Sequence, residues 1–202
     1  MTDLDTIKNT LDTNTYLSQE MKDNIFELVV LFNKNFNQIA LNNLNERLKT
    51  LKIEKISSFL SKRVSRYDIH KNTIYFNDKE LKKDYDVRHI LMLELINIIS
   101  SNNEFSGFNY EDKFEALNIG YTEMLANYLV GNDGEEMIYP HEAVMANLLS
   151  IVIGEDVLEK AYFQNDYKLL LDNVKKVGIE LAGRNGFMNW NSLANYYSNR
   201  GE

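Results

Sequence analysis

The sequence predicts an α+β fold that is predominantly α-helical, with a small antiparallel sheet over about residues 51–77 that packs against a buried helix. Apolar residues recur at three- and four-residue spacing over most of the chain, which is typical of helices that cover a core. The periodicity changes only over 51–77, where short apolar runs alternate with polar turn residues. The segment that follows is apolar around its whole circumference, as expected of a helix buried on all sides.

We expect residues 1–202 to form a single domain. A chain of 202 residues buries roughly 70% of its unfolded surface, which is enough for one sizeable core. A hydrophobic fraction of 44%, a charged fraction of 26% and a single proline are those of an ordinary globular protein without long linkers. The predicted order is a polar N-terminal lead-in over 1–17, a long helix over 18–50, the small sheet over 51–77, and helices over 84–200.

The long helix is predicted to follow an N-cap at Ser18 and to run from about 19 to 49. Its apolar stripe would pack on the core and leave an Asn, Lys and Glu face in water. The stripe comprises Ile25, Leu28, Val29, Phe32, Phe36, Ile39 and Ala40.

Two extended runs with a turn at His70-Lys71-Asn72 predict the antiparallel sheet. Its apolar residues are Ile53, Ile56, Val64, Ile69, Ile74, Tyr75 and Phe76. Beyond it, the apolar spacing predicts helices near 84–100, 116–129, 140–153, 156–163, 167–177 and 189–199, with loops over 103–112 and 131–136 and a turn at 183–186.

Charge and composition exclude several classes of partner. A net charge of −8 and a pI near 5.0 provide no basic surface for nucleic acid. No apolar run approaches the roughly 18 residues that a membrane span requires, and the first residues do not resemble a secretory signal. There is no cysteine, so neither disulfides nor thiolate metal sites can form. We therefore expect a cytoplasmic protein that binds neither nucleic acid nor membranes.

Two polar residues, Glu94 and Asn97, lie one turn apart inside the predicted buried helix. An unpaired carboxylate or amide in a core is costly, so both must have partners. The surrounding sequence, Leu93-Glu94-Leu95-Ile96-Asn97, is followed on the next predicted helix by Asn118-Ile119-Gly120-Tyr121-Thr122-Glu123.

This arrangement resembles a minimal zinc metallopeptidase domain of the gluzincin type, and it implies a zincin-like packing of strand and helices. In that family the first helix carries H-E-x-x-H, with two zinc ligands and a general base. The second helix carries N-E-G-x-T-E, whose first Glu is the third ligand. The resemblance spans roughly residues 69–163.

All three ligand positions are changed in this chain. Leu93 and Asn97 stand where the two His would be, and Ile119 stands where the ligand Glu would be. Leu and Ile have no lone pair to offer, and a neutral amide is a poor zinc ligand. Only Glu94 remains, at the general-base position. We expect no metal and no other cofactor, contact between Leu93 and Ile119 across the former metal position, and a polar remnant that comprises Glu94, Asn97, Asn118, Thr122 and Glu123.

The resemblance implies a pseudoenzyme, a catalytically inactive metallopeptidase-like protein that acts as a binding or structural module. The expected partner is another protein, and a homo-oligomer is compatible with the sequence. The contact would involve the former cleft or the aromatic residues Trp190, Tyr196 and Tyr197 near the C-terminus, which can otherwise dock a last helix on the body.

Three alternatives stay open at this point. The chain can be an enzyme that uses Glu94 with a nonstandard metal or with none, and a relocated metal site can be drawn from His89, Glu94 and His141. If the resemblance is accidental, the chain is a helical assembly component unrelated to peptidases.

Overall fold

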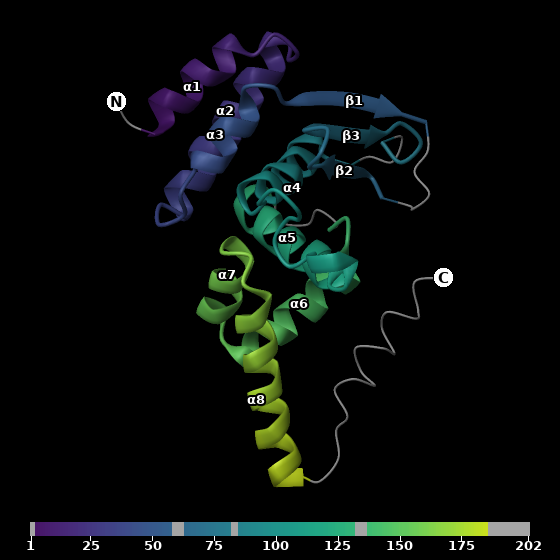
Figure 1. Ribbon diagram of the computed structural model, residues 1–202. Helices are drawn as coiled ribbons and strands as arrows, with labels where there is room; N and C mark the ends of the chain where they lie inside the picture. The colour runs from purple at the N-terminus through teal and green to yellow at the C-terminus, as the bar shows by residue number, and fades with distance from the viewer. Residues whose placement is uncertain (1–2, 58–62, 82–84, 132–136, 186–202) are drawn as a thin grey trace.

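The computed structural model describes residues 3–57, 63–81, 85–131 and 137–185 (Figure 1). Over these residues the protein is a predominantly helical α+β fold with one small sheet, which confirms the predicted class. The predicted helix over 189–199, with Trp190, Tyr196 and Tyr197 in it, lies outside the described residues.

The N-terminal region differs from the prediction at two places. Residues in the supposed lead-in form helix α1 (Asp3–Thr13), which buries Ile7 and Leu11. The long helix begins as predicted, since Ser18 accepts a hydrogen bond from the Met21 N–H at 3.3 Å, but α2 (Gln19–Asn35) ends at Asn35. The chain leaves helical geometry at Phe36 (φ −128°, ψ 51°), and a separate short helix α3 (Asn42–Leu48) follows.

The sheet has three strands, β1 (Lys52–Ile56), β2 (Ser65–Asp68) and β3 (Thr73–Asn77), in the order β1-β3-β2. As predicted, β2 and β3 form an antiparallel pair around the turn at His70-Lys71-Asn72, where Asn72 has a positive φ of 49°. The prediction of a purely antiparallel sheet is wrong, because β1 pairs with β3 in parallel, with Lys52 opposite Thr73. Strand β2 therefore lies at one edge of the sheet.

Helix α4 (Val87–Ile99) lies at the centre of the fold and is the predicted buried helix. Asp86 caps it by accepting a hydrogen bond from the Arg88 N–H at 2.8 Å. Residues on every side of α4 are buried, because β2, α2, α3 and α5 (Glu115–Val130) all pack against it. In Figure 1 the sheet covers one side of α4 and α5 lies on the other.

The remaining helices are α6 (Pro140–Ile153), α7 (Glu155–Phe163) and α8 (Tyr167–Asn185). All three begin within a residue of their predicted starts. For α6 both ends have a local signal, because Pro140 is its first residue and Gly154 follows its last. The predicted turn at 183–186 is wrong over 183–185, which belong to α8. A short 3-10 helix, η1 (Tyr110–Asp112), lies in the loop before α5.

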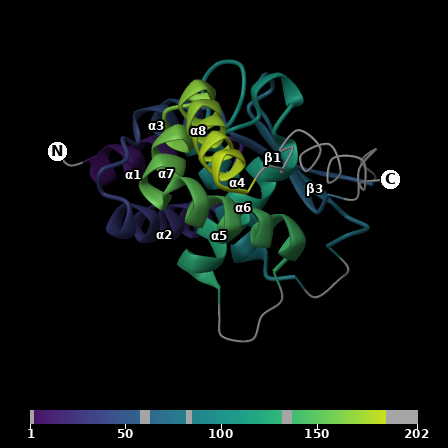
Figure 2. The same ribbon diagram turned by 90° about the horizontal axis from the view of Figure 1, so that it is seen from below.

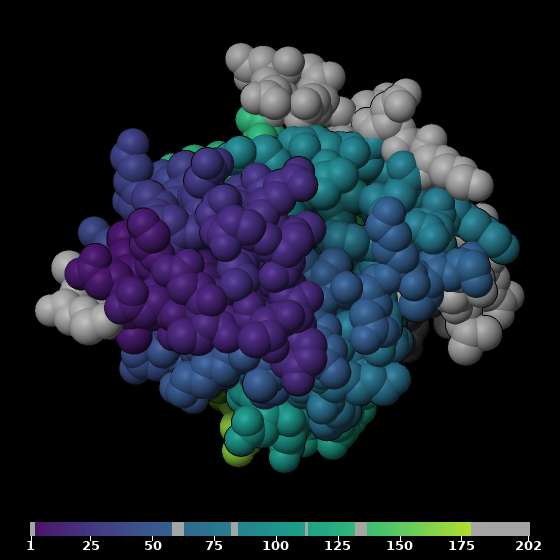
Figure 3. All heavy atoms as spheres, turned by 90° about the horizontal axis from the view of Figure 1, so that it is seen from above, coloured from purple at the N-terminus to yellow at the C-terminus, as the bar shows by residue number. Residues whose placement is uncertain are grey.

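Helices α6, α7 and α8 lie below α5 in Figure 1, and Figure 2 shows the molecule from that side. From above, the N-terminal helices and the sheet lie side by side on one face (Figure 3). Among the described helices, none combines the length and the apolar character that a bilayer crossing requires.

Candidate functional site

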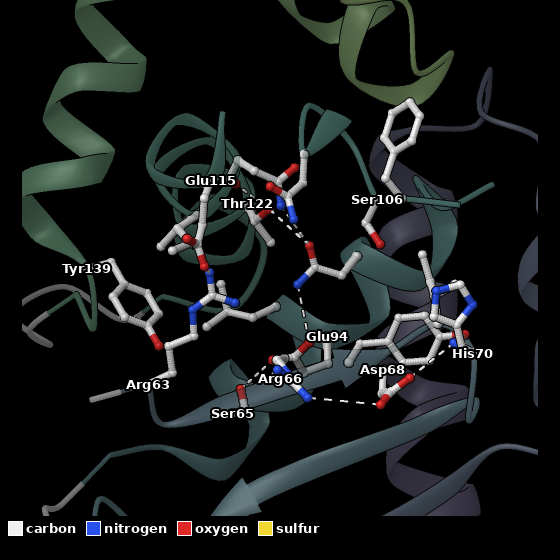
Figure 4. A pocket seen from close by; sticks show the side chains of 18 of the residues that line it. Arg63, Ser65, Arg66, Asp68, His70, Glu94, Ser106, Glu115, Thr122 and Tyr139 are labelled. Atoms are coloured by element: carbon white, nitrogen blue, oxygen red, sulfur yellow. Dashed lines mark hydrogen bonds and ion pairs between the residues drawn. The ribbon is translucent and has the colours of Figure 1, made fainter. Parts of the chain in front are cut away.

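A pocket of about 310 Å³ opens between β2, the loop after α4, and the facing sides of α4 and α5 (Figure 4). Strand β2 forms one wall and helix α5 the opposite wall. Six pocket residues come from the two motifs that the sequence analysis singled out: Leu93, Glu94, Asn97, Asn118, Ile119 and Thr122.

Glu94 is held at the floor of the pocket by hydrogen bonds within the protein. Its Oε1 accepts a hydrogen bond from the Ser65 hydroxyl at 2.5 Å, and its Oε2 accepts one from the Asn97 amide at 3.2 Å. Burial raises the pKa of Glu94 above its ordinary value, and these hydrogen bonds together with the Arg63 charge oppose that rise in pKa.

Asn97 extends this polar network from α4 to α5. Its Oδ1 accepts long hydrogen bonds from the Asn118 amide at 3.4 Å and from the Thr122 hydroxyl at 3.5 Å. Thr122 in turn lies 2.6 Å from the hydroxyl of Tyr162 on α7. The network thus runs from β2 through Glu94 and Asn97 into the core.

Leu93 and Ile119 both line the pocket, on α4 and α5 respectively. Leu93 is only 4% exposed, whereas Ile119 is half-buried. Leu93, Asn97 and Ile119, the three positions that the resemblance compares with zinc ligands, therefore line one cavity. Their side chains supply two hydrocarbons and an amide, a set of donors that does not fit zinc.

The relocated metal site of His89, Glu94 and His141 does not form. His141 is exposed at the start of α6, whereas His89 is buried in α4. Across the part of the chain that the structure describes, no three His, Cys, Asp or Glu side chains converge as metal ligands would.

Glu123 does not join the polar remnant, contrary to the prediction. Its Oε1 lies 3.0 Å from His89 Nε2 and accepts a hydrogen bond from the Ile138 N–H at 3.0 Å. The ring of His89 is not aligned for a hydrogen bond, although both side chains are buried. Glu123 follows Thr122 by one residue, and 100° of helix rotation is enough to direct it away from the pocket.

Charged and aromatic residues form the rim of the pocket (Figure 4). Arg63 forms an ion pair with Glu115 at the start of α5. Arg66 on β2 lies 3.9 Å from Asp68. The Tyr139 hydroxyl accepts a hydrogen bond from the Val64 N–H at 3.2 Å, and burial raises the pKa of Tyr139 to about 12, so this phenol remains protonated at neutral pH.

Sequence reasoning missed the contribution of β2 to this site. Ser65 donates a hydrogen bond to Glu94, but no local pattern marks it, because the two residues lie 29 positions apart in the sequence. The alternation within 51–77 predicts strands without saying which one lies at the edge.

Comparison with known proteins adds no assignment: no family model, no curated protein and no solved structure matches the chain. The resemblance to gluzincins therefore rests on the motifs and on the placement of their residues.

Proposed function

We propose that the chain is a metallopeptidase-like pseudoenzyme whose pocket binds a segment of another protein without cleaving it. The observation that carries this proposal is the common location of Leu93, Asn97 and Ile119 in one pocket beside Glu94. In a gluzincin these four positions would hold and use the zinc.

The state of Glu94 supports the loss of catalysis. A general base needs a lone pair directed at the proton that it removes. Here Ser65 and Asn97 each donate a hydrogen bond to one carboxyl oxygen of Glu94, and Ser65 lies on the strand that forms the pocket wall. The carboxyl therefore serves to attach β2 to α4.

The position of β2 supports binding of an extended segment. An edge strand offers backbone groups to which another chain can add as a further strand, while pockets beside it select side chains. Strand β2 lies at the sheet edge, and residues along its whole length line the pocket. We expect a partner segment to lie along β2 and to place an apolar side chain against Leu93 and Ile119.

Panning a peptide display library against the protein tests this proposal, with Ile119→Lys as the blocked pocket. Ile119 is half-buried on the pocket wall, so the lysine should abolish binding of the enriched peptides and leave the fold intact. The matched control is Val30→Lys, which changes a 38% exposed residue on α2 and should bind as wild type does. Equal binding to Ile119→Lys and wild type would contradict the pocket as the binding site.

The alternative is an enzyme that uses Glu94 without zinc, and one contact favours it. A hydroxyl beside a carboxylate is the arrangement of a nucleophile and its base, and Ser65 Oγ lies 2.5 Å from Glu94 Oε1 on the pocket wall. Mass spectrometry of the enriched peptides after incubation distinguishes the two functions. Cleavage by wild type that disappears in both Ser65→Ala and Glu94→Gln would favour the enzyme.

A further inference from the structure

A second pocket adjoins the pocket that contains Glu94. It has a volume of about 240 Å³ and is lined by residues of the loop after α4 and of η1, so we call it the loop pocket. Three residues, Glu104, Phe105 and Asn109, line both pockets. Figure 4 shows Ser106 of the same loop beside the first pocket, across from β2. The two pockets therefore form one continuous groove.

The loop pocket has acidic and aromatic walls. The charged residues that line it, among those that the structure describes, are Glu104 and Glu111, and the aromatic ones are Phe105 and Tyr110. The two rings meet edge to face, with their centroids 5.5 Å apart. Within the described part of the chain, the carboxylate of Glu104 forms no ion pair. A negative charge without a counter-charge thus stands on the wall that both pockets share.

Contacts within the protein hold this wall in place. The side-chain oxygen of Asn102 accepts hydrogen bonds from the Glu104 N–H at 2.6 Å and from the Phe105 N–H at 2.8 Å. The ring of Tyr110 stacks on that of Tyr167 on α8, with the centroids 4.1 Å apart. A surface that is ordered before its ligand arrives loses less conformational entropy on binding. The loop pocket is therefore built to receive a side chain.

The chain's own Lys113 shows which charge these groups accept. Its ammonium forms an ion pair with Glu111 and lies 6.0 Å from the centre of the Tyr110 ring. Lys113 approaches from outside, because it is not among the residues that line the loop pocket. Aromatic rings attract cations at their faces, and the apolar stem of a Lys or Arg packs well on apolar surface. The walls of the loop pocket therefore suit a basic side chain.

Other kinds of side chain fit the loop pocket less well. An acidic one would meet the charges of Glu104 and Glu111, and like charges repel. An apolar one would take water away from both carboxylates without replacing it by a partner, which is costly. The net charge of −8 also favours the approach of a basic partner over that of an acidic one.

We propose that the loop pocket binds a Lys or Arg side chain of the same segment that places an apolar side chain against Leu93 and Ile119. This inference rests on the proposed function and narrows it, because the partner segment must combine an apolar residue with a basic one. Successive side chains of an extended segment point to opposite faces. The two residues should therefore be an even number of positions apart.

Peptide display followed by calorimetry tests the proposal. Display peptides whose binding is abolished by Ile119→Lys should share a Lys or Arg at one even spacing from an apolar residue. One such peptide is then made with its basic residue and with norleucine, which keeps the stem without the charge. Glu104→Gln should weaken binding of the basic peptide roughly two- to fivefold, as expected of an exposed ion pair, and leave that of the norleucine peptide unchanged.

Glu54→Gln, at an exposed residue of β1, is the matched control and should bind both peptides as wild type does. Pocket-dependent peptides without a shared basic residue would overturn this inference alone. So would a Glu104→Gln variant that leaves the basic peptide unaffected or weakens both peptides equally. If no peptide is enriched, or if the enriched peptides bind Ile119→Lys as well as wild type, the proposed function fails and this inference fails with it.

Discussion

The Ser65 hydroxyl donates a hydrogen bond to Glu94 Oε1 at 2.5 Å, and this contact joins the edge strand β2 to the central helix α4. The carboxyl that a peptidase would use as a base is thereby part of the architecture. The contribution of Glu94 to the free energy of unfolding can be measured without knowing any ligand.

Replacing Glu94 with Gln should change how stability depends on pH. The raised pKa of Glu94, caused mainly by burial, means that the folded state holds this proton more tightly than the unfolded state does. The stabilising effect of the Glu94 proton is complete below the pKa of this group in the unfolded state and is lost as pH rises through its pKa in the folded state. Between these two pKa values, the free energy of unfolding of wild type should therefore fall, relative to Glu94→Gln, by about 1.4 kcal/mol for each unit of the pKa shift.

Urea unfolding at a series of pH values measures this difference. Glu54→Gln, at an exposed residue of β1, is the control and should follow the wild-type pH profile. Parallel profiles for wild type and Glu94→Gln would show that Glu94 has no raised pKa in the folded state.

Gly120→Ala should destabilise the protein although alanine favours helices. The gain in helix propensity is about 1 kcal/mol, but the added Cβ would lie 2.0 Å from the Glu142 carbonyl oxygen, which belongs to a backbone that cannot yield cheaply. Overpacking of this kind costs about 1–3 kcal/mol, occasionally more, so we expect a net loss in the free energy of unfolding, measured by urea titration.

The reverse exchange at an exposed position of the same helix is the control. Ala116 is exposed on α5, so Ala116→Gly should lose only helix propensity, about 1 kcal/mol or less. If helix propensity alone decided stability at both positions, Gly120→Ala would raise the free energy of unfolding by as much as Ala116→Gly lowers it. A Gly120→Ala variant more stable than wild type would contradict the close packing of α5 and α6.

Glu123→Ala should also destabilise the protein, because it removes the acceptor of the half-buried Ile138 N–H and the carboxylate beside the buried His89. The Ile138 N–H would lose its acceptor and His89 would lose the nearby carboxylate. Leaving a buried polar group without its partner costs about 1–3 kcal/mol. A double-mutant cycle with His89→Ala should give a coupling free energy that differs from zero, whereas additive effects would mean that the 3.0 Å contact is energetically silent.

The sequence predicted those parts of the fold whose signals are local. The cap at Ser18, the turn before β3 and the ends of α6 at Pro140 and Gly154 are all set by neighbouring residues. The end of α2 was missed because Phe36 and Ile39 continue the helical spacing after the helix has ended. Phe36 leaves the helix to pack its ring on Phe32 at 5.1 Å and on Phe163 at 6.2 Å, and the latter contact is distant in sequence.

In the candidate site, too, the local relationships were predictable and the contacts between distant segments were not. The helical spacing within each motif placed Glu94 with Asn97, and Asn118 with Thr122, and the structure brings both pairs to one pocket. The contribution of β2 and the parallel pairing of β1 depend on tertiary contacts, which periodicity does not encode.

Restoring the missing ligands tests the proposed kinship with gluzincins. In Leu93→His/Asn97→His/Ile119→Glu, two imidazoles one turn apart on α4 and a carboxylate on α5 would meet in the pocket that these positions line. We expect wild type to contain substoichiometric zinc and the triple variant to bind about one zinc per chain, as measured by elemental analysis after dialysis.

The matched control carries the same residue types with the glutamate moved to the half-buried Met124, which does not line the pocket, and it should bind less zinc. Stability provides an independent measure, because a metal that binds only the folded state stabilises it by about 2.7 kcal/mol at a hundredfold excess over Kd. Zinc should therefore raise the melting temperature of the triple variant and leave that of wild type unchanged. One tightly held zinc per wild-type chain would refute the proposed loss of the metal site, and a triple variant that folds but binds no more zinc than its control would refute the kinship itself.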